Sequence, residues 1–406
     1  MNILLINHYA GSPEMGMEFR PYYFAREWVR AGHHVDIVAA DYSHLRIRNP
    51  KVQKDFQKEI IDGIHYHWIH TNTYEGNGIR RAVTMFQFVW KLWKNAKRIA
   101  CIWRPDIVIT SSTYPLDTYA GQRIRKYCKC KLVHEIHDMW PITPIEINGM
   151  SKYHPFILML QLAENSFCKK ADYIVSLLPY AKKYLIEHGM KARKFIAIPN
   201  GVVLDEWENK EKLPKYIDQA LDKLRKQYEF ILCFFGSHTK SYALSYLIDA
   251  IKYFDKREIA LVFVGNGNEK KNLQDCSREY ENIIFFDPIP KKCIPSLMDA
   301  IDGVYVGAVD NKMFRFGICM NKLFDSMMGG KPILYAVNAP NNYIEEYKCG
   351  VSVQPESTGA LVDGIKELLS KSPDERKKMG MNGKKAVKEV FNYKALAKKF
   401  EEIFMY

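Results

Sequence analysis

Short apolar runs rich in β-branched and aromatic residues alternate along this chain with longer stretches of helical periodicity. Helical stretches such as residues 18–32 and 116–127 separate these runs, a pattern that favours a parallel sheet buried on both faces and connected by helices. In the first half of the chain the predicted strands are residues 2–7, 34–40, 64–70, 106–112, 131–138, 173–178 and 195–200.

The alternation stops after Asn200, continues as a polar segment to about Tyr228, and then begins again. A chain of 406 residues is too long for one ordinary core, so we expect two consecutive α/β domains, each a doubly wound, Rossmann-like parallel sheet. Ligands of such sheets bind beyond the carboxyl ends of the strands, and two facing domains would place these loops along one cleft. The predicted strands of the second half are residues 230–236, 259–267, 282–289, 303–309, 331–336 and 350–355.

The net charge of +13 favours an anionic partner, which could be nucleic acid, an acidic membrane surface or a phosphorylated substrate. No zinc-finger, helix-turn-helix or RNP-like pattern supports nucleic acid. The nine cysteines are scattered, and Cys128 and Cys130 have no second pair at zinc-finger spacing, so we expect reduced thiols and no metal. No apolar run approaches the roughly 18 residues of a transmembrane helix, and residues 1–9 resemble a strand more than a signal peptide. These features predict a cytoplasmic protein.

A helix preceded by a glycine-containing loop is predicted after Gly317. Asn321 is a favourable N-cap residue, and Lys322 and Leu323 would begin the helix. The free N–H groups of a helix start, with the Lys322 charge, form a potential anion site. Asp325, about one turn further on, could accept hydrogen bonds from ribose hydroxyls. Phosphate and ribose together describe a sugar nucleotide, although a capped helix with a solvated Lys and Asp is an alternative.

The turn Gly265-Asn266-Gly267 follows a predicted buried strand. Lys270 stands where the dinucleotide fingerprint requires a third glycine, and this is the second strand of its domain, so a nicotinamide site is not expected. A turn packed near a nucleotide is favoured, and an ordinary strand-to-helix turn remains possible.

Polar residues also gather where two strands of the first half lead into loops. Strand alternation places Glu135 and His137 on one face, with His137 and Asp138 at the strand end, where they could serve a substrate hydroxyl or cap the strand. The loop from Gly11 to Gly16 precedes Glu18, which could cap the first helix or project into the cleft.

Residues 80–104 contain seven basic residues and no acidic one. Aromatic and aliphatic residues recur at helical spacing within this segment. Such a helix could pack on the sheet or lie on an anionic membrane surface. The recurring residues are Phe86, Val89, Trp90, Trp93 and Ala100.

Five segments in this order resemble the retaining GT-B glycosyltransferases of family 4, over nearly the whole chain. They are HEIHDMWP (134–141), IPNGVVLDEW (198–207), VGNGNEKKNL (264–273), MNKLFDSMMGGKPIL (320–334) and the final amphipathic helix (392–406). The chain looks most similar to bacterial members that build O-antigen or capsule repeat units, such as the fucosaminyltransferase-like group. The resemblance implies an acceptor domain of residues 1–202 joined by the returning helix 392–406, and a donor domain of residues 203–391.

The family has two glutamates separated by seven residues near the donor. Asp325 occupies the second position, which binds ribose, whereas Gly317 occupies the first, which touches the donor sugar. The loop after the first strand of the second domain offers Lys240 and no Arg. The implied donor-binding residues are Gly236, Lys240, Gly265, Asn266, Gly267, Pro288, Ile289, Gly317, Ile318, Asn321, Lys322, Leu323 and Asp325. The implied catalytic residues are His137, Asp138 and Glu18, and an acceptor or phosphate loop would contain Gly11, Gly16 and Asn200.

The resemblance implies retaining transfer of a hexosyl or N-acetylhexosaminyl group from a nucleoside-diphosphate sugar, without a metal or other cofactor. A glycan acceptor on a polyprenyl diphosphate would suit the positive charge, with the enzyme cytoplasmic or peripheral on the inner face of the cell membrane. The alternatives are a sugar-nucleotide 2-epimerase of the same fold and, with less support, a nucleic-acid-binding protein.

Overall fold

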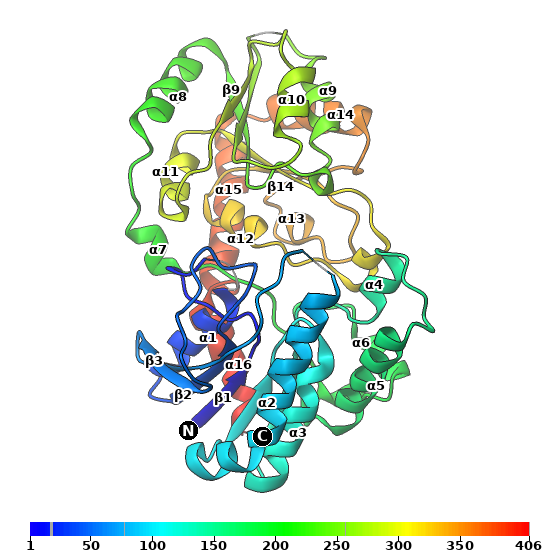
Figure 1. The fold of residues 1–406 in the computed structure, drawn as a ribbon. Helices are drawn as coiled ribbons and strands as arrows, with labels where there is room; N and C mark the ends of the chain where they lie inside the picture. The colour runs from blue at the N-terminus through cyan, green and yellow to red at the C-terminus, as the bar shows by residue number, and fades with distance from the viewer. Residues whose placement is uncertain (17–18, 77, 256, 406) are drawn as a thin grey trace. The chain divides into compact units, whose positions relative to one another are not determined.

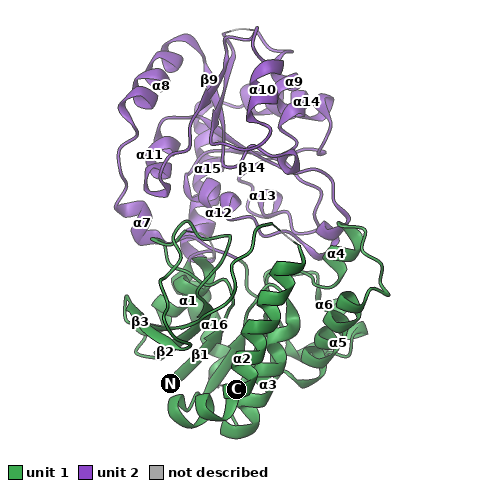
Figure 2. Cartoon of the chain, viewed as in Figure 1, with its two compact units in different colours: residues 1–199, 393–406 green, residues 200–392 purple. Residues whose placement is uncertain are grey.

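The structure is a computed structural model that describes residues 1–16, 19–76, 78–255 and 257–405. The chain divides into two compact units, coloured separately in Figure 2. Unit 1 comprises Met1–Pro199 and Tyr393–Tyr406, and unit 2 comprises Asn200–Asn392. The boundaries expected from the sequence, after residues 202 and 391, lie within three residues of these.

Unit 1 is built on a sheet that, in the described part of the chain, has eight strands in the order β3-β4-β2-β1-β5-β6-β7-β8. All neighbouring pairs are parallel except β3 with β4, which are antiparallel. The strand order reverses between β1 and β5, so the loops at their carboxyl ends flank the usual ligand position of such a sheet. The strands are β1 (Asn2–Ile6), β2 (His34–Ala40), β3 (Gln57–Ile61), β4 (Ile64–Ile69), β5 (Ile107–Thr110), β6 (Lys131–Ile136), β7 (Tyr173–Ser176) and β8 (Phe195–Ala197).

The first and last helices of the chain pack together in unit 1, as Figure 1 shows for α1 and α16. The ring of Trp28 lies 5.2 Å from that of Phe400 and 5.6 Å from that of Phe404. The returning helix is therefore part of the core of unit 1. The helices of this unit are α1 (Phe19–Arg30), α2 (Ile79–Trp103), α3 (Thr118–Cys128), α4 (Ile142–Glu146), α5 (Pro155–Lys170), α6 (Lys182–Glu187) and α16 (Tyr393–Met405), with 3-10 turns η1 (Pro115–Asp117) and η2 (Ala192–Lys194).

Helix α2 buries a different stripe from the recurring residues named in the sequence, for which sheet packing and membrane contact were both left open. The side chains that face the core formed with α3 and the sheet are Phe88, Leu92, Ala96, Ile99 and Ala100. Of those recurring residues, only Ala100 is buried and Val89 is partly so, whereas Phe86, Trp90 and Trp93 are exposed. Both sets recur at helical spacing because the helix is apolar around much of its circumference, so periodicity alone does not identify the buried face.

Unit 2 has a second parallel sheet, with six strands in the described residues and the order β11-β10-β9-β12-β13-β14. Its order reverses between β9 and β12. The four inner strands, β9, β10, β12 and β13, are buried throughout, as expected for a sheet covered by helices on both faces, whereas the edge strands β11 and β14 are only partly buried. The strands are β9 (Phe230–Phe235), β10 (Ile259–Val264), β11 (Ile283–Phe286), β12 (Gly303–Gly307), β13 (Ile333–Ala336) and β14 (Gly350–Ser352).

Two hydrophobic cores lie on opposite faces of the unit 2 sheet. One contains residues of α8, α11, α12 and α15, and the other contains residues of α9, α10 and α14. The helices are α7 (Leu204–Glu208), α8 (Lys215–Gln227), α9 (Leu244–Ile251), α10 (Lys270–Cys276), α11 (Ile294–Asp299), α12 (Asn321–Met328), α13 (Tyr343–Glu346), α14 (Thr358–Ser370) and α15 (Pro373–Glu389), with 3-10 turns η3 (Lys240–Tyr242), η4 (Lys291–Cys293) and η5 (Lys312–Phe316).

The architecture confirms the predicted fold class of two parallel-sheet α/β domains. Every strand predicted from the sequence is present, and β3 was not predicted. None of the helices in the described residues is both long enough and apolar enough to cross a membrane.

Candidate functional site

The start of α12 lies next to the strand-order reversal of unit 2, since α12 follows β12 and its second residue approaches the end of β9. The helix begins one residue earlier than predicted, because Asn321 is its first residue and Met320 is the N-cap. Within the described residues no side chain caps this end. The first N–H groups of the helix are thus open to an anionic ligand.

Lys322 projects from this helix start into an aromatic cage. Its Nζ lies 3.9 Å from the ring centroid of Phe234 and 3.5 Å from that of Tyr242. This Nζ is buried and, among the described residues, has no hydrogen-bond partner. Burial lowers the pKa of Lys322 to about 7. The ring faces attract the cation, but they do not replace the hydrogen bonds it loses from water, so an anion would be a favourable partner.

His238 is a second unpartnered group, in the loop that follows β9. It is fully buried, and neither ring nitrogen has a hydrogen-bond partner in the described structure. Burial, with smaller contributions from the Lys270 and Lys322 charges, lowers its pKa to about 4, so His238 is neutral near pH 7. From this loop, Gly236 and Lys240 were predicted to bind the donor, and Lys240 is exposed at the start of η3. The signal available for His238 was its position after the first strand of the domain.

The Gly265-Asn266-Gly267 turn packs directly on the loop after β9. A Cβ atom on Gly265 would lie 1.9 Å from the Gly236 carbonyl oxygen, and one on Gly267 would lie 2.2 Å from that of His238. Glycine is therefore required by the close approach of two backbones. Lys270, at the place of the missing third glycine, donates to the carbonyl oxygens of Gly265 and Phe286 at 3.1 and 3.3 Å and fastens the turn.

Asp325 lies on α12 one turn beyond the helix start, among charged residues of neighbouring elements. Burial raises its pKa, whereas the Lys291 charge lowers it and Glu206 raises it further. Lys291 also pairs with Glu206 at 3.2 Å. Pro288 and Ile289 lie just before Pro290, the N-cap of the η4 turn that carries Lys291.

Gly317 has a backbone conformation that explains the departure from the family pattern. Its φ of +96° lies in the region that favours glycine. Asn341 holds the next residue from both sides, since Ile318 N–H donates to Asn341 Oδ1 at 2.8 Å and Asn341 Nδ2 donates to the Ile318 carbonyl at 2.7 Å. A glutamate at position 317 would therefore be strained in this loop.

In unit 1 a buried polar network occupies the corresponding strand-order reversal. Arg20 donates to Glu135 Oε1 through Nε at 3.0 Å and Nη2 at 2.9 Å. Ser111 donates to Glu135 Oε2 at 2.6 Å, and His137 Nε2 lies 2.8 Å from Ser111 Oγ and 3.2 Å from Glu135 Oε2. Asn7 ties β1 to this group by donating to the Ser111 carbonyl at 2.5 Å.

The charges of this network are strongly coupled. Burial alone would raise the pKa of Glu135, but Arg20, His137 and Ser111 together hold it well below its usual range. Arg20 also donates to the carbonyl oxygens of Pro199 and Ile198 at 2.7 and 2.8 Å. Glu135 is therefore a fixed anion that orients His137, and His137 retains some exposure. Strand alternation predicted that Glu135 and His137 share a face, but no pattern in the sequence pointed to Arg20, the second residue of α1.

Asp138 has a local structural partner for each carboxylate oxygen. Oδ1 accepts from Met139 N–H and Thr143 Oγ1, both at 2.8 Å, and Oδ2 accepts from the Trp140 indole at 3.1 Å. These bonds order the loop into α4, so the capping alternative fits Asp138 better than direct catalysis does.

His134 lies on the other face of β6 and is buried. Its ring centroid is 3.8 Å from that of Phe167, and its side chain is hydrogen-bonded to Thr110. Burial lowers the pKa of His134 to about 3.

The remaining predicted site residues are Gly11, Gly16, Glu18 and Asn200. Gly16 has a φ of +88°, Gly11 accepts a hydrogen bond from the Tyr66 hydroxyl at 2.7 Å, and Glu18 lies outside the described residues. Asn200 belongs to unit 2, where its N–H donates to Cys319 Sγ at 3.0 Å and so supports the loop before α12.

The two halves of the chain match two family models. Residues 15–206 match Glycosyltransferase Family 4, and residues 216–386 match Glycosyl transferases group 1. With its two parallel α/β units, the protein is a glycosyltransferase of the GT-B fold. The first half of the chain thus contains a family 4 region and the second half a group 1 region of glycosyltransferases.

A curated relative is an uncharacterised glycosyltransferase of Methanocaldococcus jannaschii, which is 25% identical over 326 residues, or 78% of each chain. Three solved structures share the fold at lower identity. Sucrose-phosphate synthase from Thermosynechococcus elongatus has a TM-score of 0.71 at 17% identity, with 100% of this chain and 98% of that chain covered. Anabaena HepE in complex with UDP and glucose has a TM-score of 0.64 at 16% identity, with 100% and 99% covered. WaaG, a glycosyltransferase involved in lipopolysaccharide biosynthesis, has a TM-score of 0.64 at 15% identity, with 99% of each chain covered.

Proposed function

We propose that the protein transfers a hexosyl or N-acetylhexosaminyl group from a nucleoside-diphosphate sugar to a glycan, with retention of anomeric configuration and without a metal. The observation that carries this proposal is the buried, unpartnered Lys322 ammonium at an uncapped helix start. An anionic diphosphate supplies the partner that this site lacks.

In the transfer step the bond between the anomeric carbon and the diphosphate oxygen breaks, and negative charge develops on the departing diphosphate. Lys322 and the N–H groups of α12 meet that charge, with Lys240 available from the exposed η3 turn. These groups are fixed before the reaction, so little reorganisation is needed. Asp325 accepts hydrogen bonds from the ribose hydroxyls one turn away, and residues 265–267 and 288–289 border the nucleotide.

We assign His137 to the sugar-transfer step, because unit 1 holds it by Glu135 and Ser111 while it retains some exposure. It donates to a sugar hydroxyl, and the Glu135 carboxylate keeps its ring oriented. Glu18 and the residue 11–16 loop are assigned to the acceptor or phosphate, and Asp138 orders the loop that follows His137.

We further propose a lipid-linked acceptor for bacterial surface polysaccharide, with the enzyme bound peripherally at the cytoplasmic face of the membrane. Support comes from an exposed ridge on α2, defined by Ile79, Val83, Phe86, Trp90 and Trp93. Lys94 and Lys97 are exposed beside these apolar side chains. A basic helix with exposed aromatic side chains suits an anionic lipid surface. The lipopolysaccharide role named for WaaG supports the same class of acceptor.

The direct test incubates the protein with a panel of nucleoside-diphosphate sugars, with and without a polyprenyl-diphosphate glycan acceptor, in the presence of EDTA. We expect acceptor-dependent release of the diphosphate and a product whose anomeric configuration, measured by NMR, equals that of the donor. Conversion of the donor to its 2-epimer without acceptor would identify the alternative enzyme. An inverted product, or activity restored only by magnesium or manganese, would overturn the proposed mechanism.

His137→Ala provides a second test of the site. We expect turnover to fall by about a hundredfold or more, because general acid–base and hydrogen-bond contributions at a reacting centre are of this size. The nucleoside-diphosphate affinity, measured by calorimetry, should change little. Equal losses of turnover and affinity would show that His137 has a structural role instead.

A further inference from the structure

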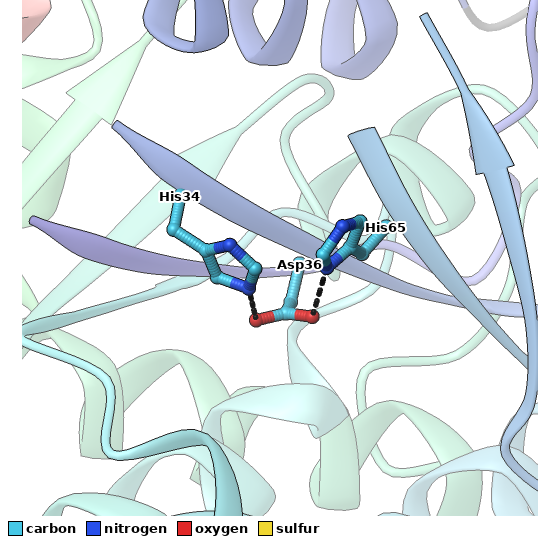
Figure 3. Close-up of side chains that lie close together, drawn as sticks. All are labelled: His34, Asp36 and His65. Carbon is cyan, nitrogen blue, oxygen red and sulfur yellow. Dashed lines mark ion pairs between the residues drawn. The ribbon is translucent and has the colours of Figure 1, made fainter. Parts of the chain in front are cut away.

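We propose that His34, Asp36 and His65 bind a zinc ion at the amino-terminal edge of the unit 1 sheet. Figure 3 shows the two imidazole rings on either side of the Asp36 carboxylate. Among the described residues, the three form a group whose candidate ligand atoms all lie within 4.8 Å of one another. The proposed transfer reaction does not use these residues.

The sheet brings the three side chains together. His34 and Asp36 are two residues apart on β2 and so project from the same face. Asp36 is in register with His65 on the adjacent parallel strand β4. This arrangement joins ligands from segments about thirty positions apart in the sequence, which explains why no short motif revealed it.

The distances suit a tetrahedral ion. His34 Nε2 lies 3.2 Å from Asp36 Oδ2, and His65 Nδ1 lies 3.8 Å from Asp36 Oδ1. Zinc bonds of about 2.0–2.1 Å place neighbouring tetrahedral ligands roughly 3.3 Å apart. Small side-chain rotations are therefore enough to close the site. Three protein ligands leave one position for water, and the exposed ring of His34 provides a route for the ion.

His67 positions the carboxylate. Its Nε2 lies 2.6 Å from Asp36 Oδ1, and its ring stacks on Trp103 at a centroid distance of 4.1 Å. Ligating carboxylates in metal sites are themselves held by hydrogen bonds of this kind. His67 is buried, so it acts through Asp36 and is not a fourth ligand in this arrangement. Lys58, in register with His67, opposes a cation, but it is exposed and can turn to solvent.

The proposed zinc site lies at a different edge of the unit 1 sheet from His137. His34 begins β2 and His65 is the second residue of β4, whereas His137 follows the carboxyl end of β6. Parallel sheets bind their substrates at the carboxyl edge. At the opposite edge an ion bridges β2 and β4, and it also orders Trp103, the last residue of α2, through Asp36 and His67. Its effect is on the stability of unit 1, so the metal-free transfer proposed above is unaffected.

The test uses full-length protein dialysed against EDTA and then freed of chelator, titrated with zinc chloride by calorimetry. We expect saturable binding of one ion per chain and a rise in melting temperature with zinc. His34→Gln/His65→Gln should abolish both. His67→Phe should weaken binding by about tenfold to a hundredfold, the usual effect of removing a group that holds a metal ligand.

The matched control is His70→Gln, a similarly exposed histidine of the same region that pairs with Asp41 and should bind zinc like the wild type. His34→Gln alone keeps the test decisive if the double variant does not fold, since His34 is exposed and contributes no core packing. Absence of saturable zinc binding by the wild type, or equal binding by the wild type and the His34→Gln variant, would overturn the proposal. Because the readouts are binding and melting, failure of the proposed transferase function would leave this result unchanged.

Discussion

The buried polar groups at the two strand-order reversals differ in whether they have hydrogen-bond partners. In unit 1, Arg20, Glu135, Ser111 and His137 are connected by short hydrogen bonds and an ion pair. In unit 2, Lys322 and His238 are buried with no partner for their side-chain nitrogens in the described residues. A completed network keeps its side chains oriented whether or not a ligand is bound. Buried polar groups without partners lower the free energy of unfolding, and a bound ligand of opposite charge offsets this loss.

Replacing Arg20 by Met should have the largest effect on stability. The substitution leaves the Glu135 carboxylate buried without its cation, which typically costs about 3–5 kcal/mol. Urea denaturation of the variant measures this cost. Arg48→Met is the matched control, because the Arg48–Glu14 pair is long, at 3.8 Å, and largely exposed, and exposed pairs contribute about 0–1 kcal/mol. Similar losses in both variants would remove the distinction drawn for unit 1.

Lys322→Met should weaken ligand binding without destabilising the protein, unlike Arg20→Met. We expect the free energy of unfolding to stay constant or rise, because an unpaired buried ammonium is replaced by an apolar side chain. The nucleoside-diphosphate affinity should fall by about tenfold to a hundredfold, the value of one charge-assisted hydrogen bond of roughly 1.5–3 kcal/mol. Calorimetry and thermal melting measure the two quantities.

Lys270→Met is the control for that variant. Lys270 donates to two carbonyl oxygens and to Asp287, so its replacement should destabilise unit 2. If Lys322→Met destabilises the protein as much as Lys270→Met does, then Lys322 serves the fold and not a ligand.

Gly317→Ala tests whether the loop before α12 depends on glycine. At a φ of +96° an added Cβ should cost about 1–2 kcal/mol, measured by urea denaturation. Gly359→Ala is the counterpart in helix α14, where an added Cβ meets open space, and it should stabilise the protein by about 0.5–1 kcal/mol. Equal effects of the same sign would show that the backbone conformation of Gly317 is not what excludes a larger side chain.

The smallest expected effect is a proton taken up on nucleotide binding. The pKa of Lys322 is about 7 in the free protein, and a bound diphosphate should raise it, because an adjacent anion favours the charged form. Calorimetry near pH 8 in buffers of different ionisation enthalpy should detect uptake of up to one proton, and the affinity should fall as the pH rises above 7. The Lys322→Met variant should show neither effect.

The same pKa predicts a pH dependence of stability. The unfolded chain keeps the Lys322 proton up to about pH 10.5, whereas the folded chain loses it above about pH 7. Between these values the unfolded state binds more protons, so this residue makes the free energy of unfolding rise with pH. Melting curves of the wild type and the Lys322→Met variant should therefore differ in slope across this range.

The sequence predicted most of the fold because each buried strand is a continuous apolar run between glycine or polar boundaries. It missed β3, whose sequence QKEII is partly polar because the strand is at the sheet edge and pairs only with β4. It left the buried face of α2 undecided because apolar side chains occupy both the buried stripe and the exposed ridge, and packing alone distinguishes them.

The candidate site was predictable where chemistry follows position along a strand or helix. Lys322, Asp325 and His137 were predicted in this way. The cage of Phe234 and Tyr242 around Lys322, the burial of His238, and the pairing of Arg20 with Glu135 all join residues that are distant in the sequence. Asp138 was misleading because a carboxylate at a strand end can cap a loop as readily as it can serve a substrate.

Helix α16 returns to unit 1 after the whole of unit 2 has been completed. During synthesis the ribosome therefore releases all of unit 2 before Phe400 and Phe404 can cover the Trp28 surface of α1. Domains generally fold as they emerge, so unit 2 can reach its native state while the aromatic face of unit 1 is still bare. A nascent chain stalled before residue 393 would leave this aromatic face of unit 1 exposed to solvent.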